Sequence, residues 1–200
     1  MRPRLARGTP PLIAALWLLP LVVRGPGLRV AAVTLAGTAT WVFRDPDRTP
    51  EGDGLLAAAD GVVQRVGTDG DGRTTVSTYL NLFDVHVTRA PCDGVVVRQS
   101  YRAGGHRRAS TSGADANERL EWHLATDHGE VLLTQYAGAV ARRIVAYRSP
   151  GDRIRRGERI GLIRFGSRVD VRLPDGVCVT VQPRARLTGG ASVLARVEVA

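Results

Sequence analysis

Two stretches near the end of the chain alternate apolar and polar residues with a period of two. The first, RIGLIRF, covers residues 159–165, and the second, VDVRLP, covers residues 169–174. This alternation is typical of half-buried β-strands, so the sequence predicts two strands here. Between them lies Gly166–Ser167, and a glycine inside such a pattern indicates a bend with exposed backbone. Taken alone, the dipeptide fits an ordinary turn as well as a reactive peptide bond.

The remainder of the chain after Leu55 consists of short apolar runs bounded by glycine, proline and aspartate. An Asp-Gly pair ends at Gly61, Gly94 and Gly176, and these pairs open the runs VVQRV, VVVRQ and VCVTV. Asp-Gly is a strong turn signal before a strand. The pattern therefore predicts a mainly β domain, a small barrel-sandwich-like arrangement of short strands.

The N-terminal part has a different pattern, with two apolar runs at Leu12–Val23 and Leu28–Phe43 joined by Arg24–Gly27. Each run is shorter than the ~20 residues that a straight bilayer crossing needs. We expect two short helices that form a membrane hairpin or lie at the membrane interface. This divides the chain into an anchor, residues 1–44, and a catalytic domain, residues 45–200.

A secretory signal peptide is the alternative for this N-terminal segment, because a basic start precedes an apolar core. No small-residue cleavage site follows the first run, and a signal peptide leaves the second run unexplained. Arginines flank both ends of the segment. Under the positive-inside tendency, the domain that follows lies on the cytoplasmic side of the cell membrane.

Composition narrows the chemistry, because the formal net charge of +9 comes from arginine and the sequence contains no lysine. Without lysine the chain cannot form a lysine Schiff base, carry biotin or lipoate, or build a phosphate-binding P-loop. The positive charge favours an acidic partner, either a nucleic acid or an anionic membrane. Aromatic residues do not interleave with the arginines as a base-stacking surface requires, so we expect a membrane and no nucleic acid.

Candidate catalytic residues are Ser167, His86 and Asp60, the aspartate of the first Asp-Gly turn, which follows the apolar run LLAAA. In an apolar strand pattern, Asp84, His86 and Thr88 are expected to share one face. A serine, a histidine and an aspartate also fit a hydrolase triad, but no GxSxG motif surrounds the serine. A lone histidine on a strand and an aspartate before glycine also have ordinary structural roles.

A metal site is not expected, because the other histidines lack the spacing to cysteines or carboxylates that zinc requires. These histidines are His106, His123 and His128.

Several segments together resemble the phosphatidylserine decarboxylase family in its short, membrane-associated form. They follow the family's order and cover most of the chain after Trp41: FRDPDR (43–48), AADG (58–61), LNLFDVHVTRAPCDG (80–94), NERL (117–120), AGAVARRIV (137–145) and GERIGLIRFGSRVDVRLP (157–174).

The resemblance implies a self-processing proenzyme that cleaves itself between Gly166 and Ser167. It implies a β chain of residues 1–166 and an α chain of residues 167–200, held together as a heterodimer. Ser167 then becomes a covalent pyruvoyl group, the only cofactor implied. This ketone takes the place of a lysine-bound cofactor, because it captures the amine of phosphatidylserine and acts as an electron sink. The products are phosphatidylethanolamine and carbon dioxide.

The resemblance also assigns proton transfer to His86, oriented by Asp60 or Asp84. Longer bacterial members of the family carry a second histidine three residues later, where this chain has Arg89. We therefore assign the base in self-cleavage and the proton donor in decarboxylation both to His86. An archaeal-type serine phospholipid fits the same residues. Two alternatives are a non-catalytic membrane-anchored β-domain and a serine hydrolase that uses Asp60, His86 and Ser167.

Overall fold

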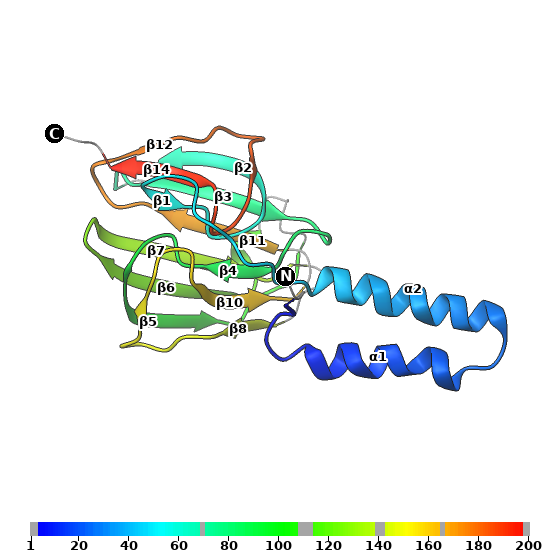
Figure 1. Cartoon of the computed structure of the whole chain (residues 1–200). Helices are drawn as coiled ribbons and strands as arrows, with labels where there is room; N and C mark the ends of the chain where they lie inside the picture. Colours follow the sequence, from blue (N-terminus) through cyan, green and yellow to red (C-terminus); the bar gives the residue numbers. More distant parts are fainter. Residues whose placement is uncertain (1–3, 69–70, 108–113, 139–142, 165–166, 198–200) are drawn as a thin grey trace. The chain divides into compact units, whose positions relative to one another are not determined.

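The structure is a computed structural model that describes residues 4–68, 71–107, 114–138, 143–164 and 167–197. The chain divides into two compact units, Met1–Asp47 and Arg48–Ala200. The first unit consists of two helices and the second is built from strands (Figure 1). The prediction of a mainly β chain is therefore confirmed.

The helical unit is a pair of helices, α1 (Pro10–Val22) and α2 (Pro26–Val42), as the two apolar runs predict. Proline stands in the first turn of both helices, where its fixed φ is favourable and no N–H is lost from the ladder. Trp17 Nε1 donates a hydrogen bond to Thr40 Oγ1 at 3.0 Å and joins the two helices. Among the described residues, neither helix combines the length and apolarity that a bilayer crossing requires.

The second unit contains fourteen strands in the part of the chain that the structure describes, arranged in three sheets. The large sheet has the order β13 (Arg186–Leu187), β2 (Gly61–Thr68), β3 (Thr74–Leu80), β11 (Ser167–Arg172), β7 (Gly129–Tyr136), β6 (Arg119–Thr126), β5 (Gly94–Arg102) and β9 (Arg153–Ile154). One small sheet contains β1 (Leu55–Leu56), β14 (Val193–Val197) and β12 (Val177–Val179). The other contains β4 (Val87–Arg89), β10 (Arg159–Ile163) and β8 (Ile144–Ala146). A short 3₁₀ turn, η1 (Ala114–Ala116), precedes β6.

The Asp-Gly turns lie where the sequence predicts them, because β2 and β5 begin at Gly61 and Gly94. Gly61 has a φ of +145°, and a Cβ at this position would lie 2.2 Å from the carbonyl oxygen of Tyr79. Only glycine fits here, since the turn brings β2 directly against β3. The third pair also precedes a strand, as β12 begins at Val177.

A single apolar core lies inside the β unit, and the large sheet curls around it (Figure 1). Alternate residues of β11 and β6, such as Val169 and Trp122, point into this core. Polar side chains join the large sheet to the β4 sheet, because Trp122 Nε1 donates to Gln135 Oε1 at 2.7 Å and Gln135 Nε2 donates to Thr88 Oγ1 at 2.8 Å. All three side chains are buried, so this bridge fixes β4 against β7.

The two strands predicted around the Gly-Ser dipeptide are present, as β10 and β11. They belong to different sheets, so the connection between them passes from the β4 sheet to the centre of the large sheet. Gly166, the residue predicted to precede the cleaved bond, lies outside the described residues.

Candidate active site

Ser167 is the first residue of β11, and it is completely buried. It pairs with Leu80 of β3, and its side chain shares the core-facing side of the strand with Val169 and Val171. Within the described part of the chain, no donor or acceptor lies within hydrogen-bond reach of Ser167 Oγ. A buried hydroxyl normally has a partner. This serine is thus in an environment that suits a reacting group better than an ordinary turn residue.

His86 lies immediately before β4 and is only 4% exposed. Its carbonyl oxygen accepts a hydrogen bond from the N–H of Ile163 at 3.1 Å. Ile163 is the last residue of β10 and stands four positions before Ser167. The backbone of His86 therefore lies beside the chain that leads to the serine.

Asp60 is brought to the same region by backbone pairing. Arg89 N donates to Ala58 O at 2.8 Å, and Leu56 N donates to Pro91 O at 2.8 Å. Asp60 follows Ala58 by two residues, at the end of a bend over residues 58–60, so this pairing fixes the segment that leads to Asp60 against β4. Backbone hydrogen bonds thus join the segments that carry His86 and Asp60 to their neighbours in the β4 sheet, and contact of the two side chains with Ser167 stays a prediction.

The carboxylate of Asp60 is held in place by two further contacts. The N–H of Gly189 donates to Asp60 Oδ1 at 2.8 Å, and Arg48 Nη2 donates to Oδ2 at 2.8 Å. Both favour the ionised form that a residue orienting a histidine requires. Arg48 is the last residue of the FRDPDR segment, so this segment supplies the guanidinium that binds the Asp60 carboxylate.

Asp84 does not lie on a strand with His86, so the predicted alternation is wrong at this position. Residues 81–84 form a turn in which Asp84 Oδ2 accepts the N–H of Asn81 at 2.8 Å, and β4 begins only at Val87. Asp84 Oδ1 accepts a hydrogen bond from Arg186. Both oxygens of Asp84 thus stabilise the turn, and we retain Asp60 as the residue predicted to orient His86.

Arg89 occupies the place of the second histidine in the longer relatives, and it is 3% exposed. Its Nη1 donates to the carbonyl oxygen of Gly157 at 3.0 Å. Gly190 lies so close that a Cβ there would be 2.3 Å from Arg89 Cδ. A guanidinium stays protonated at neutral pH and cannot act as a base, so Arg89 has a structural role.

A charged cluster beside Ser167 was missed at the sequence level. The guanidinium of Arg168 lies 4.1 Å above the ring of Tyr136 and 3.0 Å from Asp170 Oδ1, and it also pairs with Asp115. Burial raises the pKa of Asp170, whereas the hydrogen bond from Arg168 lowers the pKa of Asp115. The cluster fixes the start of β11 on the side of the sheet opposite to Ser167 Oγ. Its only sequence signal is the alternation of charges in RVDVR, which is also typical of a solvent-facing strand.

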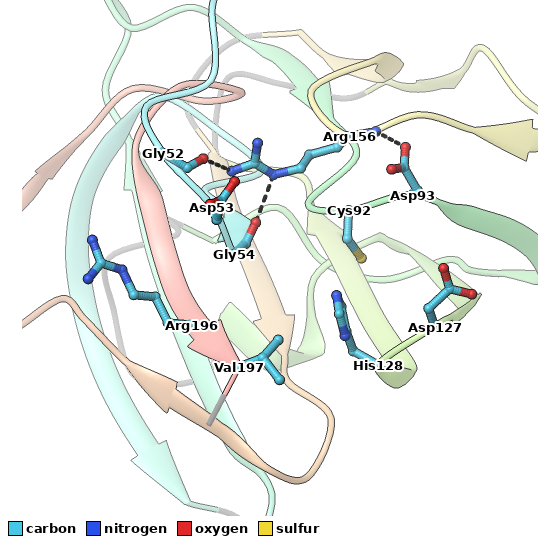
Figure 2. Close-up of a pocket in the computed structure, with 10 residues that line it drawn as sticks. All are labelled: Gly52, Asp53, Gly54, Cys92, Asp93, Asp127, His128, Arg156, Arg196 and Val197. Atoms are coloured by element: carbon cyan, nitrogen blue, oxygen red, sulfur yellow. Dashed lines mark hydrogen bonds between the residues drawn. The ribbon is translucent and has the colours of Figure 1, made fainter. Parts of the chain in front are cut away.

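A cavity of about 740 Å³ lies elsewhere in the β unit, lined by residues that include Cys92, His128 and Arg156 (Figure 2). Arg156 Nε donates to Gly54 O at 2.7 Å, so this guanidinium is engaged by the backbone. His128 is in the turn that precedes β7, whereas the end of β11 that holds Ser167 meets β7 at Tyr136. His128 and Tyr136 are eight residues apart along β7 and the turn before it, a distance of roughly 26 Å. The cavity is therefore not part of the serine site.

The remaining histidines have other partners. His123 Nδ1 lies 2.8 Å from Glu130 Oε1, and its Nε2 lies 2.9 Å from Arg98 Nη2. His106 faces Glu118 at 4.0 Å. Within the described ranges, no three metal-ligating side chains come together.

The fold and the site define a class: a β-rich protein whose buried serine starts a central strand at a junction between sheets. The family model for phosphatidylserine decarboxylase matches residues 35–195. The phosphatidylserine decarboxylase proenzyme of Thermobifida fusca is 45% identical, covering 97% of this chain and 93% of that protein. The proenzyme of the same name from Streptomyces griseus is 40% identical, with 96% and 94% covered. The chain belongs to the phosphatidylserine decarboxylase family, as its motifs predict.

A further relative bears on the choice of lipid. The "Putative archaetidylserine decarboxylase proenzyme" of Methanococcoides burtonii is 42% identical, with 78% of this chain and 74% of that protein covered. The family match favours an enzyme over a non-catalytic domain and over a serine hydrolase. The roles of Ser167, His86 and Asp60 stay predictions.

Proposed function

We propose that this chain is a proenzyme that cleaves itself between Gly166 and Ser167 and then converts phosphatidylserine to phosphatidylethanolamine and carbon dioxide. The observation that carries the proposal is the buried Ser167 at the start of β11, with the backbone of His86 alongside the preceding strand. The serine of a hydrolase must be accessible to an external substrate. A serine that attacks the peptide bond before it can be buried, as Ser167 is.

In the self-cleavage that we propose, Ser167 Oγ attacks the carbonyl carbon of Gly166 while His86 accepts the hydroxyl proton. The peptide bond to Ser167 breaks as an ester to Oγ forms. Removal of the Ser167 α-proton then expels the Gly166 carboxylate and leaves dehydroalanine. Addition of water and loss of ammonia convert this residue to a pyruvoyl group. Asp60 orients His86 throughout.

The residues present fit a cofactor built from the backbone. The sequence contains no lysine that could bind a carbonyl cofactor. Ser167 lies next to the core residues Leu80 and Val169. A pyruvoyl ketone there supplies the carbonyl that takes the substrate amine and the electron sink for the loss of carbon dioxide. His86 holds the proton that is delivered to the substrate carbon afterwards.

The membrane enters this proposal through the helical unit. Large apolar side chains of both helices are exposed, among them Leu21 at 77%, Leu28 at 62% and Trp41 at 59%. Apolar surface of this extent on paired helices suits the membrane interface. We infer that residues 1–44 anchor a barrel-sandwich-like catalytic domain at the cell membrane, with that domain on the cytoplasmic side.

The test is an intact-mass measurement on the purified full chain combined with a decarboxylation assay. We expect two chains, 1–166 and 167–200, with the smaller one beginning at a pyruvoyl group and therefore blocked to Edman degradation. Carbon dioxide should be released from phosphatidylserine in detergent micelles, and a parallel assay with archaetidylserine compares the two serine headgroup lipids. One uncleaved chain that reacts with serine-directed phosphonates would overturn the proposal in favour of a hydrolase. One uncleaved, unreactive chain would favour a non-catalytic domain.

A further inference from the structure

The turn between β3 and β4 carries two adjacent apolar side chains on its surface. Leu82 is 44% exposed and Phe83 is 59% exposed, whereas Asp84 and Val85, which follow them, are each 2% exposed. In the described part of the β unit, the other large apolar side chains that are more than a third exposed are Val97, Tyr101 and Val197, which lie on strands. Two neighbouring exposed apolar side chains at a loop tip suit contact with an apolar surface.

The turn is firmly built. Asn81 Oδ1 accepts the N–H of Phe83 at 2.8 Å, and Asp84 Oδ2 accepts the N–H of Asn81 at 2.8 Å. The second carboxylate oxygen of Asp84 accepts a hydrogen bond from Arg186. The backbone thus presents Leu82 and Phe83 outward in a defined conformation, and the cost of ordering the loop is already met within the protein.

The turn also stands at the predicted active site. It begins directly after Leu80, the strand partner of Ser167, and His86 follows it two residues after Asp84. The turn therefore follows directly on the strand residue that pairs with the first residue of the proposed α chain.

A positively charged side chain, Arg186, contacts the same turn. Arg186 contacts the turn through Asp84, and its side chain is 67% exposed. An exposed arginine that contacts the same turn can bind the phosphate of a lipid headgroup when the apolar side chains of the turn enter the acyl region.

We propose that the Asn81–Asp84 turn inserts Leu82 and Phe83 into the bilayer that contains the substrate, with Arg186 at the phosphate level, and so admits the serine phospholipid to the site at Ser167. This inference rests on the proposed function and names the route by which its substrate enters. The occupant is the acyl layer of a phospholipid membrane. The turn belongs to the β unit, so this membrane contact is additional to the one that we infer for the helical unit.

The test compares two double variants of the full chain. The first replaces Leu82→Ser and Phe83→Ser, and the control replaces Val97→Ser and Val197→Ser, which are similarly exposed at 59% and 39%. For each protein, turnover is measured on vesicles containing phosphatidylserine and on a short-chain phosphatidylserine below its micelle concentration. We expect the ratio of vesicle to monomer turnover to fall about tenfold to a hundredfold in the loop variant, because two apolar side chains leave the membrane contact. The control should keep the wild-type ratio.

An unchanged ratio in the loop variant would overturn the inference. A second measurement, Phe83→Trp with vesicles of brominated phospholipid, should show more fluorescence quenching than the wild-type tryptophans alone. No additional quenching would overturn it too. Failure of the proposed function is distinguishable, because the wild-type chain would then release no carbon dioxide from either substrate.

Discussion

Arg186 donates a hydrogen bond to Asp84 at 2.5 Å, although 102 positions separate the two residues in the sequence. Under the proposed cleavage, Arg186 belongs to the α chain and Asp84 to the β chain. The same holds for β11, which pairs with β3 on one side and with β7 on the other. The α chain therefore contributes the central strand β11 and the edge strand β13 to a sheet whose other six strands come from the β chain.

We expect the two chains to stay together after cleavage, because separating them breaks the pairing of β11 with β3 and β7, of β13 with β2 and of β14 with β1. It also exposes core residues such as Val169 and Val171. Native size-exclusion chromatography should give one peak at the volume of the uncleaved protein. The same fraction should resolve into two chains on a denaturing gel. Elution of the small chain by itself without denaturant would contradict this assembly.

Replacing Ser167→Ala should abolish cleavage, because the methyl side chain has no oxygen to attack the preceding carbonyl. Ser167→Cys should still cleave, at a different rate, because a thiol can form the corresponding thioester. Intact mass followed over time distinguishes the three proteins, and Ser149→Ala, at an exposed position, is the control that should cleave normally. Two chains in the alanine variant would rule out Ser167 as the nucleophile.

Replacing His86→Ala should slow self-cleavage by about 10²- to 10⁴-fold, the usual contribution of a positioned general base. Any cleaved fraction should also turn over slowly, because the proton donor is missing. His123→Gln serves as the control, since His123 contacts Glu130 and Arg98 away from the site. Normal cleavage together with normal turnover in the His86 variant would refute both roles, provided that its thermal unfolding resembles that of the wild type.

The strands around Gly166–Ser167 were predictable because a period of two is a local signal. Their distribution over two sheets was not, because β10 and β11 differ only in long-range partners that no local pattern encodes. The same limit applies to the segment before Asp60, because Ala58 pairs with Arg89, about thirty positions away in the sequence. Family resemblance identified the candidate residues, whereas no local pattern predicts this pairing.

The errors at the site have local physical causes. Asp84 was predicted on a strand, but its carboxylate and the side chain of Asn81 bond to nearby backbone N–H groups, and such bonds favour a turn over a sheet ladder. Arg168 and Asp170 were passed over because alternating charges usually mark a solvent-facing side of a strand. Here both sides of β11 are covered, and the charges neutralise each other in a buried position.

A final prediction concerns Cys92, because burial raises the pKa of its thiol to about 11. The thiol of a cysteine in an unfolded chain has a pKa of about 8.5. The folded state thus favours the neutral thiol, so the stabilisation from this group is complete below about pH 8.5 and is lost as the pH rises toward 11. The loss amounts to about 3 kcal/mol at most, from 1.36 kcal/mol per pKa unit.

Urea unfolding between pH 8 and 11 measures this slope directly. Cys92→Ala should lower the stability at pH 8, because it leaves a small cavity, and should flatten the decline above pH 8.5, because the titrating group is gone. Cys178→Ala should keep the wild-type slope, since Cys178 is exposed. Iodoacetamide at neutral pH should accordingly modify Cys178 well before Cys92, because only the thiolate reacts and the thiol of Cys92 is both neutral and covered. A decline with pH that is equally steep in wild type and Cys92→Ala would show that other groups control the alkaline stability.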